Sequence, residues 1–202
     1  MSKSTVAVLL SVPLVGTIAS MQPANAYTPD TDPLRESLYF VSRVQEATVL
    51  QERFIGNSKD QEELRNKMKL TLLLVEKNYK LLNQINYASQ YVEPKDALVE
   101  ASEAGYEAVD ALNGAIDFVK NELKTGPLTN DQREFLQSSM QSCRENLFVF
   151  GKYMPQDKLA FARKRVEEEN VKNRDEFDSE NLGSDAGVYN PIVLPWKEKG
   201  RS

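Results

Sequence analysis

An apolar periodicity of three and four residues constrains this chain more than any other feature. It falls into four segments, which are residues 32–56, 58–91, 94–126 and 129–151. Apolar residues with this spacing line one stripe of an α-helix, while the polar residues between them face water. Each stripe has to be buried against another element, so the sequence predicts an all-α fold with four long helices.

Within each segment the apolar residues follow one another at helical intervals. The stripes hold, in order, Leu34, Leu38, Val41, Val44 and Thr48; then Leu64, Met68, Leu72, Val75, Tyr79, Leu82 and Ile85; then Leu98, Ala101, Gly105, Val109, Leu112, Ile116, Val119 and Leu123; then Phe135, Leu136, Met140, Cys143, Leu147 and Phe150. The three connections are short, and short connections place consecutive helices side by side in opposite directions. The expected architecture is an up-down-up-down four-helix bundle over residues 27–151.

Residues typical of helix ends bound the first two segments. Asp32 can cap the first helix, and Gly56 is its expected end. Ser58 and Gln61 have the spacing of a capping box at the start of the second helix. We expect that helix to run unbroken to about Tyr91.

The third and fourth segments have similar boundaries. Pro94 is expected to open the third helix, and the Gly-Pro pair at residues 126–127 is expected to close it. The fourth helix should begin at Thr129 or the next residue, because Thr129 and Gln132 also have capping-box spacing. Its expected end is Gly151.

The pattern changes after residue 151. Pro155 can begin an extra helix, but that helix has too few apolar positions to be a full bundle member, and we expect it to be short. From Asn170 onward the composition favours irregular chain. Residues 152–202 are therefore expected to form a short extra helix followed by an irregular, extended C-terminal tail.

Residues 1–26 are typical of a cleaved export signal. Lys3 is the only charge before an apolar stretch at residues 6–18, and Ala-Asn-Ala at residues 24–26 matches an A-x-A cleavage signature. The apolar stretch is shorter than the ~20 residues of a membrane-spanning helix. We expect the mature chain to begin at Tyr27 and to work across a membrane from its site of synthesis, in a thylakoid lumen or a bacterial periplasm.

Composition excludes several classes of chemistry. The chain has no histidine, so it cannot build a Ser-His-Asp triad, a Cys-His pair or a zincin site. Its single cysteine, Cys143, falls in an apolar stripe and is expected to be buried and inert. The net charge of -5 argues against a nucleic-acid partner, because phosphate contacts need clustered cations. We expect no enzymatic activity and no directly bound metal or cofactor.

Two features exceed what a helical bundle needs. One is a basic cluster in an acidic chain, and the other is an apolar segment, residues 188–196, that holds the only tryptophan. Prolines bias this segment toward an extended conformation, so it either folds back on the bundle or inserts into a partner. The candidate partner-docking residues are Lys158, Arg163, Lys164, Arg165, Tyr189, Ile192, Val193, Leu194 and Trp196.

A signal that ends in Ala-Asn-Ala, followed by an acidic four-helix bundle with a boundary proline at Pro94, resembles the PsbQ-like extrinsic subunits of photosystem II, particularly the diatom and red-lineage forms. The resemblance covers residues 1 to about 151. It implies a plastid protein of the thylakoid lumen that docks on the membrane-intrinsic core and on other extrinsic subunits. Such proteins stabilise the calcium and chloride environment of the oxygen-evolving complex without ligating manganese.

A second class of protein fits the same features. A periplasmic helical protein without enzymatic activity, acting as an adaptor, a chaperone-like binder or a carrier of a small ligand, would also begin with a cleaved signal. Co-purification with chlorophyll-containing membranes would distinguish the two classes.

Overall fold

The structure, a computed structural model, describes residues 27–57, 62–123, 126–179 and 194–197. Its α-helices are α1 (Pro33–Asn57), α2 (Glu62–Tyr79), α3 (Leu81–Ala88), α4 (Leu98–Asp117), α5 (Asn130–Lys152) and α6 (Gln156–Ser179). The shorter turns are η1 (Ser89–Tyr91), η2 (Lys95–Ala97), the π-helical η3 (Phe118–Glu122) and η5 (Pro195–Lys197). All regular structure in the described residues is helical, which confirms the expected all-α class. The predicted export signal lies outside these residues.

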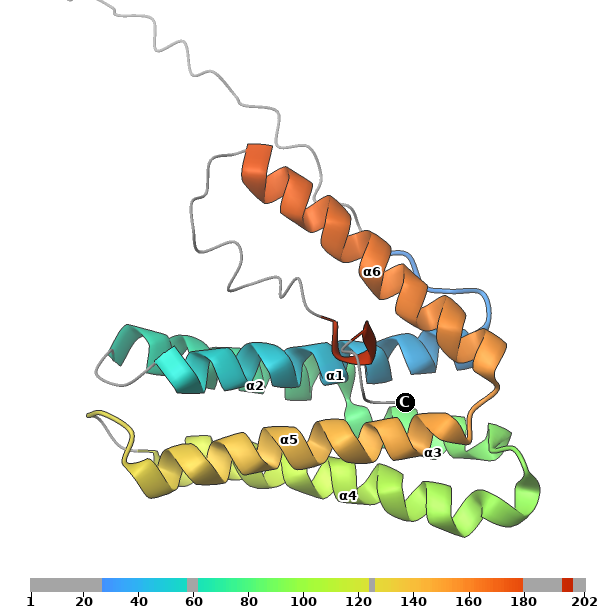
Figure 1. Cartoon of the computed structure of the whole chain (residues 1–202), viewed down its shortest axis with the longest axis horizontal. Coiled ribbons are helices and arrows are strands. Elements are labelled where there is room, and N and C mark those ends of the chain that lie inside the picture. Colours follow the sequence, from blue (N-terminus) through green and yellow to red (C-terminus); the bar gives the residue numbers. More distant parts are fainter. Residues whose placement is uncertain (1–26, 58–61, 124–125, 180–193, 198–202) are drawn as a thin grey trace, which may run out of the picture.

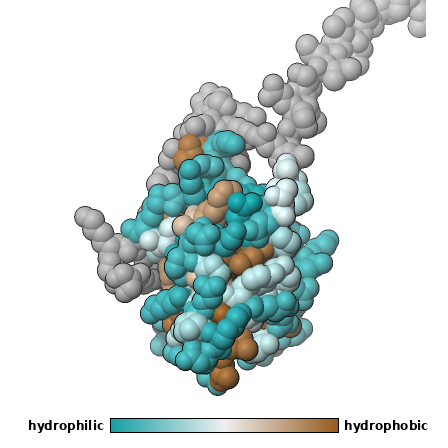
Figure 2. Space-filling model, turned by 90° about the vertical axis from the view of Figure 1, so that its right-hand side faces the viewer, coloured by the Kyte–Doolittle hydropathy of each residue, from teal (hydrophilic) through white to brown (hydrophobic). Residues whose placement is uncertain are grey.

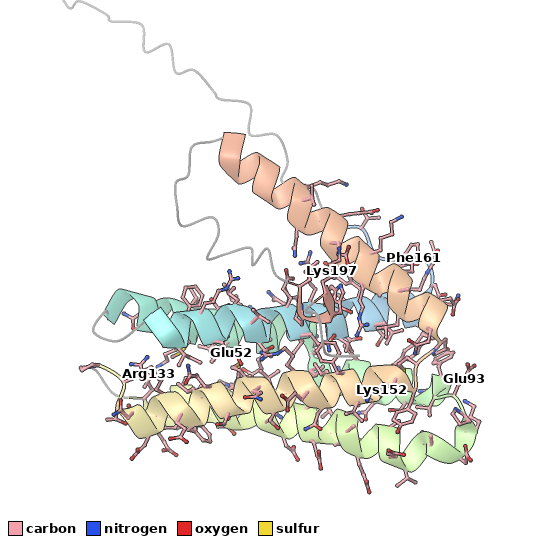
Figure 3. All side chains as sticks on the ribbon, in the orientation of Figure 1. Glu52, Glu93, Arg133, Lys152, Phe161 and Lys197 are labelled. Atoms are coloured by element: carbon pink, nitrogen blue, oxygen red, sulfur yellow. The ribbon has the colours of Figure 1, made fainter. Side chains whose placement is uncertain are left out.

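The helices are arranged in two parts (Figure 1). Four long segments, α1, α2 with α3, α4 and α5, lie side by side, and α6 crosses α1 at an angle. α5 packs along α4 and α1, and α1 also contacts α2, α3 and α6. α1 is therefore enclosed by other helices along most of its length. An ion pair between Arg144 Nη2 and Glu52 Oε1, 2.8 Å long, links α5 to α1 (Figure 3).

Two of the expected helix caps are confirmed. The Asp32 carboxylate accepts hydrogen bonds from the backbone N–H groups of Leu34, at 2.9 Å, and Arg35, at 3.3 Å. Thr129 forms a complete capping box with Gln132, because each side chain accepts a hydrogen bond from the other residue's backbone N–H. These bonds satisfy N–H groups that have no partner inside a helix. The expected capping box at residues 58–61 lies outside the described residues.

The second helix is not continuous, contrary to the expectation. Lys80 adopts a left-handed conformation with φ of 47° and separates α2 from α3. The Gln84 side chain donates a hydrogen bond to the Tyr79 carbonyl oxygen at 3.1 Å, which satisfies an acceptor at the break. The register shifts there, so Leu81 is buried, whereas Leu82 is 45% exposed. The assignment of Leu82 to the inner stripe was therefore wrong.

Other boundaries also differ from the expected ones. The third helix begins at Leu98, after the η2 turn, rather than directly at Pro94. Leu98 itself is half-exposed, as is Phe135 on α5. α1 includes Gly56 and ends one residue later. The remaining described stripe residues of α1, α4 and α5 are buried or partly buried, so the core lies where the apolar periodicity placed it.

The extra helix is much longer than expected. α6 has 24 residues, and its buried side chains Leu159, Ala162 and Val166 supply only a narrow apolar face. The prediction of a short helix counted apolar positions alone. The charged residues of α6 pair with those of α1, and these contacts are described below.

The surface of one face is largely hydrophilic, with hydrophobic side chains scattered between the polar ones (Figure 2). Half-exposed apolar residues include Leu70 and Leu74, one turn apart on α2, and Val171 on α6. None of the described helices combines the length and the apolar composition that crossing a membrane requires.

Candidate functional site

The cations of the predicted basic cluster lie on the first half of α6, where this helix meets α1. Lys158 Nζ forms an ion pair of 2.9 Å with Asp32 Oδ2. Arg165 pairs with Glu36 at 3.0 Å and donates to the Thr28 carbonyl oxygen at 2.7 Å. These two cations therefore hold α6 against α1 and the residues before it.

A second set of polar contacts joins α1 to α6 further along, near the middle of α6. The Arg43 guanidinium pairs with Glu46 at 2.6 Å and with Glu169, and it donates to the Asn170 side chain at 2.8 Å. The Tyr39 hydroxyl donates to Glu169 at 2.8 Å. We call the contacts of these residues, with those of Asp32, Glu36, Lys158 and Arg165, the α1–α6 seam.

The electrostatics of the seam follow from burial and pairing. Burial raises the pKa of Tyr39 to about 12, so its hydroxyl keeps its proton and can donate to Glu169. Burial alone would raise the pKa of Glu169, but hydrogen bonds from Tyr39 and Arg43 outweigh it and lower that pKa. The hydrogen bond from Lys158 lowers the pKa of Asp32 in the same way. Both carboxylates are therefore ionised in the folded chain at neutral pH.

Lys164 differs from its neighbours. Its side chain is 73% exposed, and its contact with Glu168, 3.6 Å long, lies on the surface of α6. Exposed pairs of this kind contribute little to stability. Of the predicted basic cluster, Lys164 is the residue that the structure leaves most open to a partner.

The terminal apolar segment contacts α6 where the structure describes it. Leu194 is buried, and the indole N–H of Trp196 donates to Glu167 Oε1 at 2.9 Å. Lys197 Nζ pairs with the other oxygen of Glu167 at 2.5 Å (Figure 3). Residues 194–197 thus fold back on the chain. The other predicted anchors, Tyr189, Ile192 and Val193, lie outside the described residues.

Arg163 lies in a different environment, beside a pocket that the sequence did not reveal. The pocket has a volume of about 360 Å³ and is formed by the C-terminal half of α5, the start of α6 and Trp196. The Arg163 guanidinium carbon lies 5.3 Å from the centroid of the Trp196 ring and 5.6 Å from that of Phe148. The one sequence feature that pointed to this pocket was the sole tryptophan in the C-terminal tail. Nothing in the sequence indicates which helix that tryptophan contacts.

The remaining candidate chemistry is structural. Cys143 is completely buried, and burial raises the pKa of its thiol to about 12, so the thiol is protonated and unreactive in the folded chain. Within the described residues, no three side chains of the metal-ligating types gather at one point.

Comparison of the chain with protein-family models, with curated proteins and with solved structures finds no match. A function therefore has to be argued from the structure, in which three features surround α6. They are the polar seam to α1, the C-terminal segment that contacts α6, and the pocket between α5 and α6.

Proposed function

We propose that this chain is an extrinsic structural subunit on the lumenal face of photosystem II. In this proposal α1, α2 with α3, α4 and α5 form an up-down-up-down four-helix bundle, and α6 is an arm attached to it. The chain docks on core subunits and other extrinsic subunits, stabilises the oxygen-evolving complex and performs no turnover. Its location is the thylakoid lumen, at the periphery of the membrane.

The observation that carries the proposal is the course of α6. The helix is fixed to α1 as far as Asn170 and then diverges from the other helices (Figure 1). The contacts that the described residues make between the two helices extend to Glu169 and Asn170, and Val171 is 47% exposed. A helix that is held at one end and projects at the other presents a surface to a partner without disturbing the core.

The seam gives the basic cluster a different role from the one expected. Lys158 and Arg165 are paired within the chain, so in this proposal they fix the direction of the arm. Docking then depends on the exposed part of α6, which includes Lys164 and Val171. An exposed cation also steers a chain toward an acidic partner, and salt screens this attraction.

The experiment is a rebinding assay with photosynthetic membranes from the organism that carries the chain. Membranes stripped with 1 M NaCl are incubated with the chain and washed, and the bound fraction is measured by immunoblotting. We expect saturable binding that falls in Val171→Asp. Val99→Asp is the matched control, because Val99 is exposed and lies on α4. A chain that fails to bind stripped membranes at any salt concentration contradicts the proposal.

One observation favours the alternative, a periplasmic helical binding or adaptor protein. The pocket beside Trp196 is of a size that suits a small ligand, which a purely structural subunit does not need. Cell fractionation separates the two proposals, because the alternative requires the chain to appear in a periplasmic extract without chlorophyll-containing membranes.

A further inference from the structure

The pocket between α5 and α6 contains a cation without a counter-ion. Arg163 makes no ion pair with any residue that the structure describes, and its Nε atom is buried without a hydrogen-bond partner. Burial lowers the pKa of its guanidinium below the usual value. By contrast, Arg43 and Arg165 each pair with two carboxylates. A partly buried charge that stays unpaired is costly, and such groups concentrate at binding sites.

The other walls of the pocket define what could accompany an anion there. Phe148, Val149, Leu159 and Trp196 supply an apolar surface. Gly151 leaves room beside the guanidinium, since a methyl group at its α-carbon would come within 3.8 Å of Arg163 Nη2. These walls are apolar, and the Arg163 guanidinium lies beside them.

The remaining polar groups of the pocket leave a net positive charge of one. Lys152 lines the pocket, and Figure 3 shows it near the end of α5. Glu145 also lines it, and its carboxylate accepts a hydrogen bond from Gln141 at 2.8 Å. The Gln156 amide donates to the backbone carbonyl oxygens of Gly151 and Met154, so its N–H groups are already used. One monoanion balances Lys152 and Arg163 against Glu145.

We propose that this pocket binds a small apolar carboxylate. The carboxylate accepts two parallel hydrogen bonds from the edge of the Arg163 guanidinium, a geometry that this planar fork favours. The apolar body of the ligand packs against Phe148, Leu159 and Trp196, in a volume of the kind that small-molecule sites occupy. The inference stands apart from membrane docking, because it uses neither Lys164 nor Val171.

The sole tryptophan makes the test direct. Trp196 lines the pocket, so the tryptophan fluorescence of the full chain reports on a ligand that enters it. The probe is 4-cyclohexylbutanoate, which does not absorb in the same range, and the matched probe is its uncharged amide. We expect a saturable change in tryptophan fluorescence when the carboxylate is added. The amide should bind at least about tenfold more weakly, because the charge-assisted hydrogen bonds are lost.

Two substitutions and one control locate the effect. Arg163→Gln should weaken carboxylate binding by about tenfold or more and remove the preference over the amide. Arg163→Lys keeps the charge but not the planar fork, and should bind with intermediate affinity. Lys164→Gln removes an adjacent but exposed cation, so this variant should bind the carboxylate with the same affinity as the unmodified chain. Far-UV circular dichroism checks that each variant remains folded.

Three results overturn the proposal. The first is equal affinity for the carboxylate and the amide, and the second is the absence of saturation at millimolar concentration. The third is binding that appears only in a chain that ends at Lys197, since the pocket would then be occupied by the chain's own last residues.

Discussion

The interface between α4 and α5 and the seam between α1 and α6 join helices by different means. α4 contributes small residues to its buried face, including Ala101, Gly105 and Ala108, and α5 contributes larger ones such as Leu147 and Phe150. The contact is close: a methyl group added at Gly105 would lie 2.5 Å from the Ile85 side chain and 3.3 Å from that of Phe150. At the α1–α6 seam a network of ion pairs connects the two helices instead, and α6 buries only a narrow apolar face.

The difference divides the chain into two parts: α1 to α5, which apolar burial holds together, and α6, which charged pairs hold against α1. Apolar packing depends little on pH or ionic strength, whereas paired charges respond to both. The helices α1 to α5, which we call the body, should therefore remain folded under conditions that loosen α6. The predictions below test this division, beginning with the largest expected effect.

Truncation of a core residue should cost the most. Leu147→Ala on α5 and Leu72→Ala on α2 remove side chains that are 1% exposed. Each should lower the free energy of unfolding by about 2–5 kcal/mol, because the transfer free energy is lost and a cavity remains. Chemical denaturation of each variant measures the change.

The matched control for these substitutions is Leu82→Ala. The break at Lys80 leaves Leu82 45% exposed, so its truncation should change the free energy of unfolding by only about 0.5 kcal/mol. A loss comparable with that of Leu147→Ala would mean that α3 packs in the register expected for an unbroken helix.

Removal of the central cation of the seam should have the next largest effect. Arg43→Met deletes contacts with Glu46, Glu169 and the Asn170 side chain, and it leaves the Glu46 carboxylate, on a side chain that is 8% exposed, without an ion-pair partner. We expect a loss of about 1.5–3 kcal/mol, the range for hydrogen bonds to charged groups. Limited proteolysis should cut the variant first within α6.

The control for Arg43→Met is an ion pair of similar length on the surface. Lys120 pairs with Glu76 at 2.7 Å, but the two side chains are 35% and 44% exposed. Lys120→Met should therefore cost no more than about 1 kcal/mol. Equal losses in the two variants would show that the seam is no more than a set of surface pairs.

The two interfaces also differ in how well the sequence predicted them. The apolar stripes of α4 and α5 were visible because burial repeats at helical intervals, and the caps at Asp32 and Thr129 follow from local hydrogen bonding. The break at Lys80 was not visible, because lysine has no preference for a left-handed conformation.

The seam and the pocket depend on residues that are far apart in the chain. Arg43 and Glu169 are 126 positions apart, and Trp196 lies 29 positions from Glu167. A charged residue does not indicate its partner in the sequence, so the basic cluster was interpreted as a docking surface. The same limit explains why α6 was expected to be short: its partners are on α1.

Acid should loosen the seam before it unfolds the body. The pKa values of Asp32 and Glu169 are lower in the folded chain than their usual values of 3.8 and 4.5. Their contribution to stability is therefore present above those usual values and is lost as the pH falls below them. The fluorescence of Trp196, which lies against α6, should change at a higher pH than the far-UV circular dichroism of the helices.

A variant checks the cause of this acid transition. Glu169→Gln lacks one of the two carboxylates, so its fluorescence should depend less steeply on pH between about 5 and 3. Coincident changes in fluorescence and circular dichroism, in both the variant and the unmodified chain, would show that the chain unfolds as one unit and would contradict the division.

The smallest effect is expected at Lys164, which lies on the same helix but outside the seam. Its pair with Glu168 is 3.6 Å long, and the two side chains are 73% and 60% exposed. Lys164→Gln should therefore change the free energy of unfolding by less than about 0.5 kcal/mol, and the change should vanish in 1 M NaCl because salt screens exposed charges. Urea denaturation at low and high salt measures both values. A loss close to that of Arg43→Met would place Lys164 within the seam, and stability of α6 would then depend on charges that the fold leaves in water.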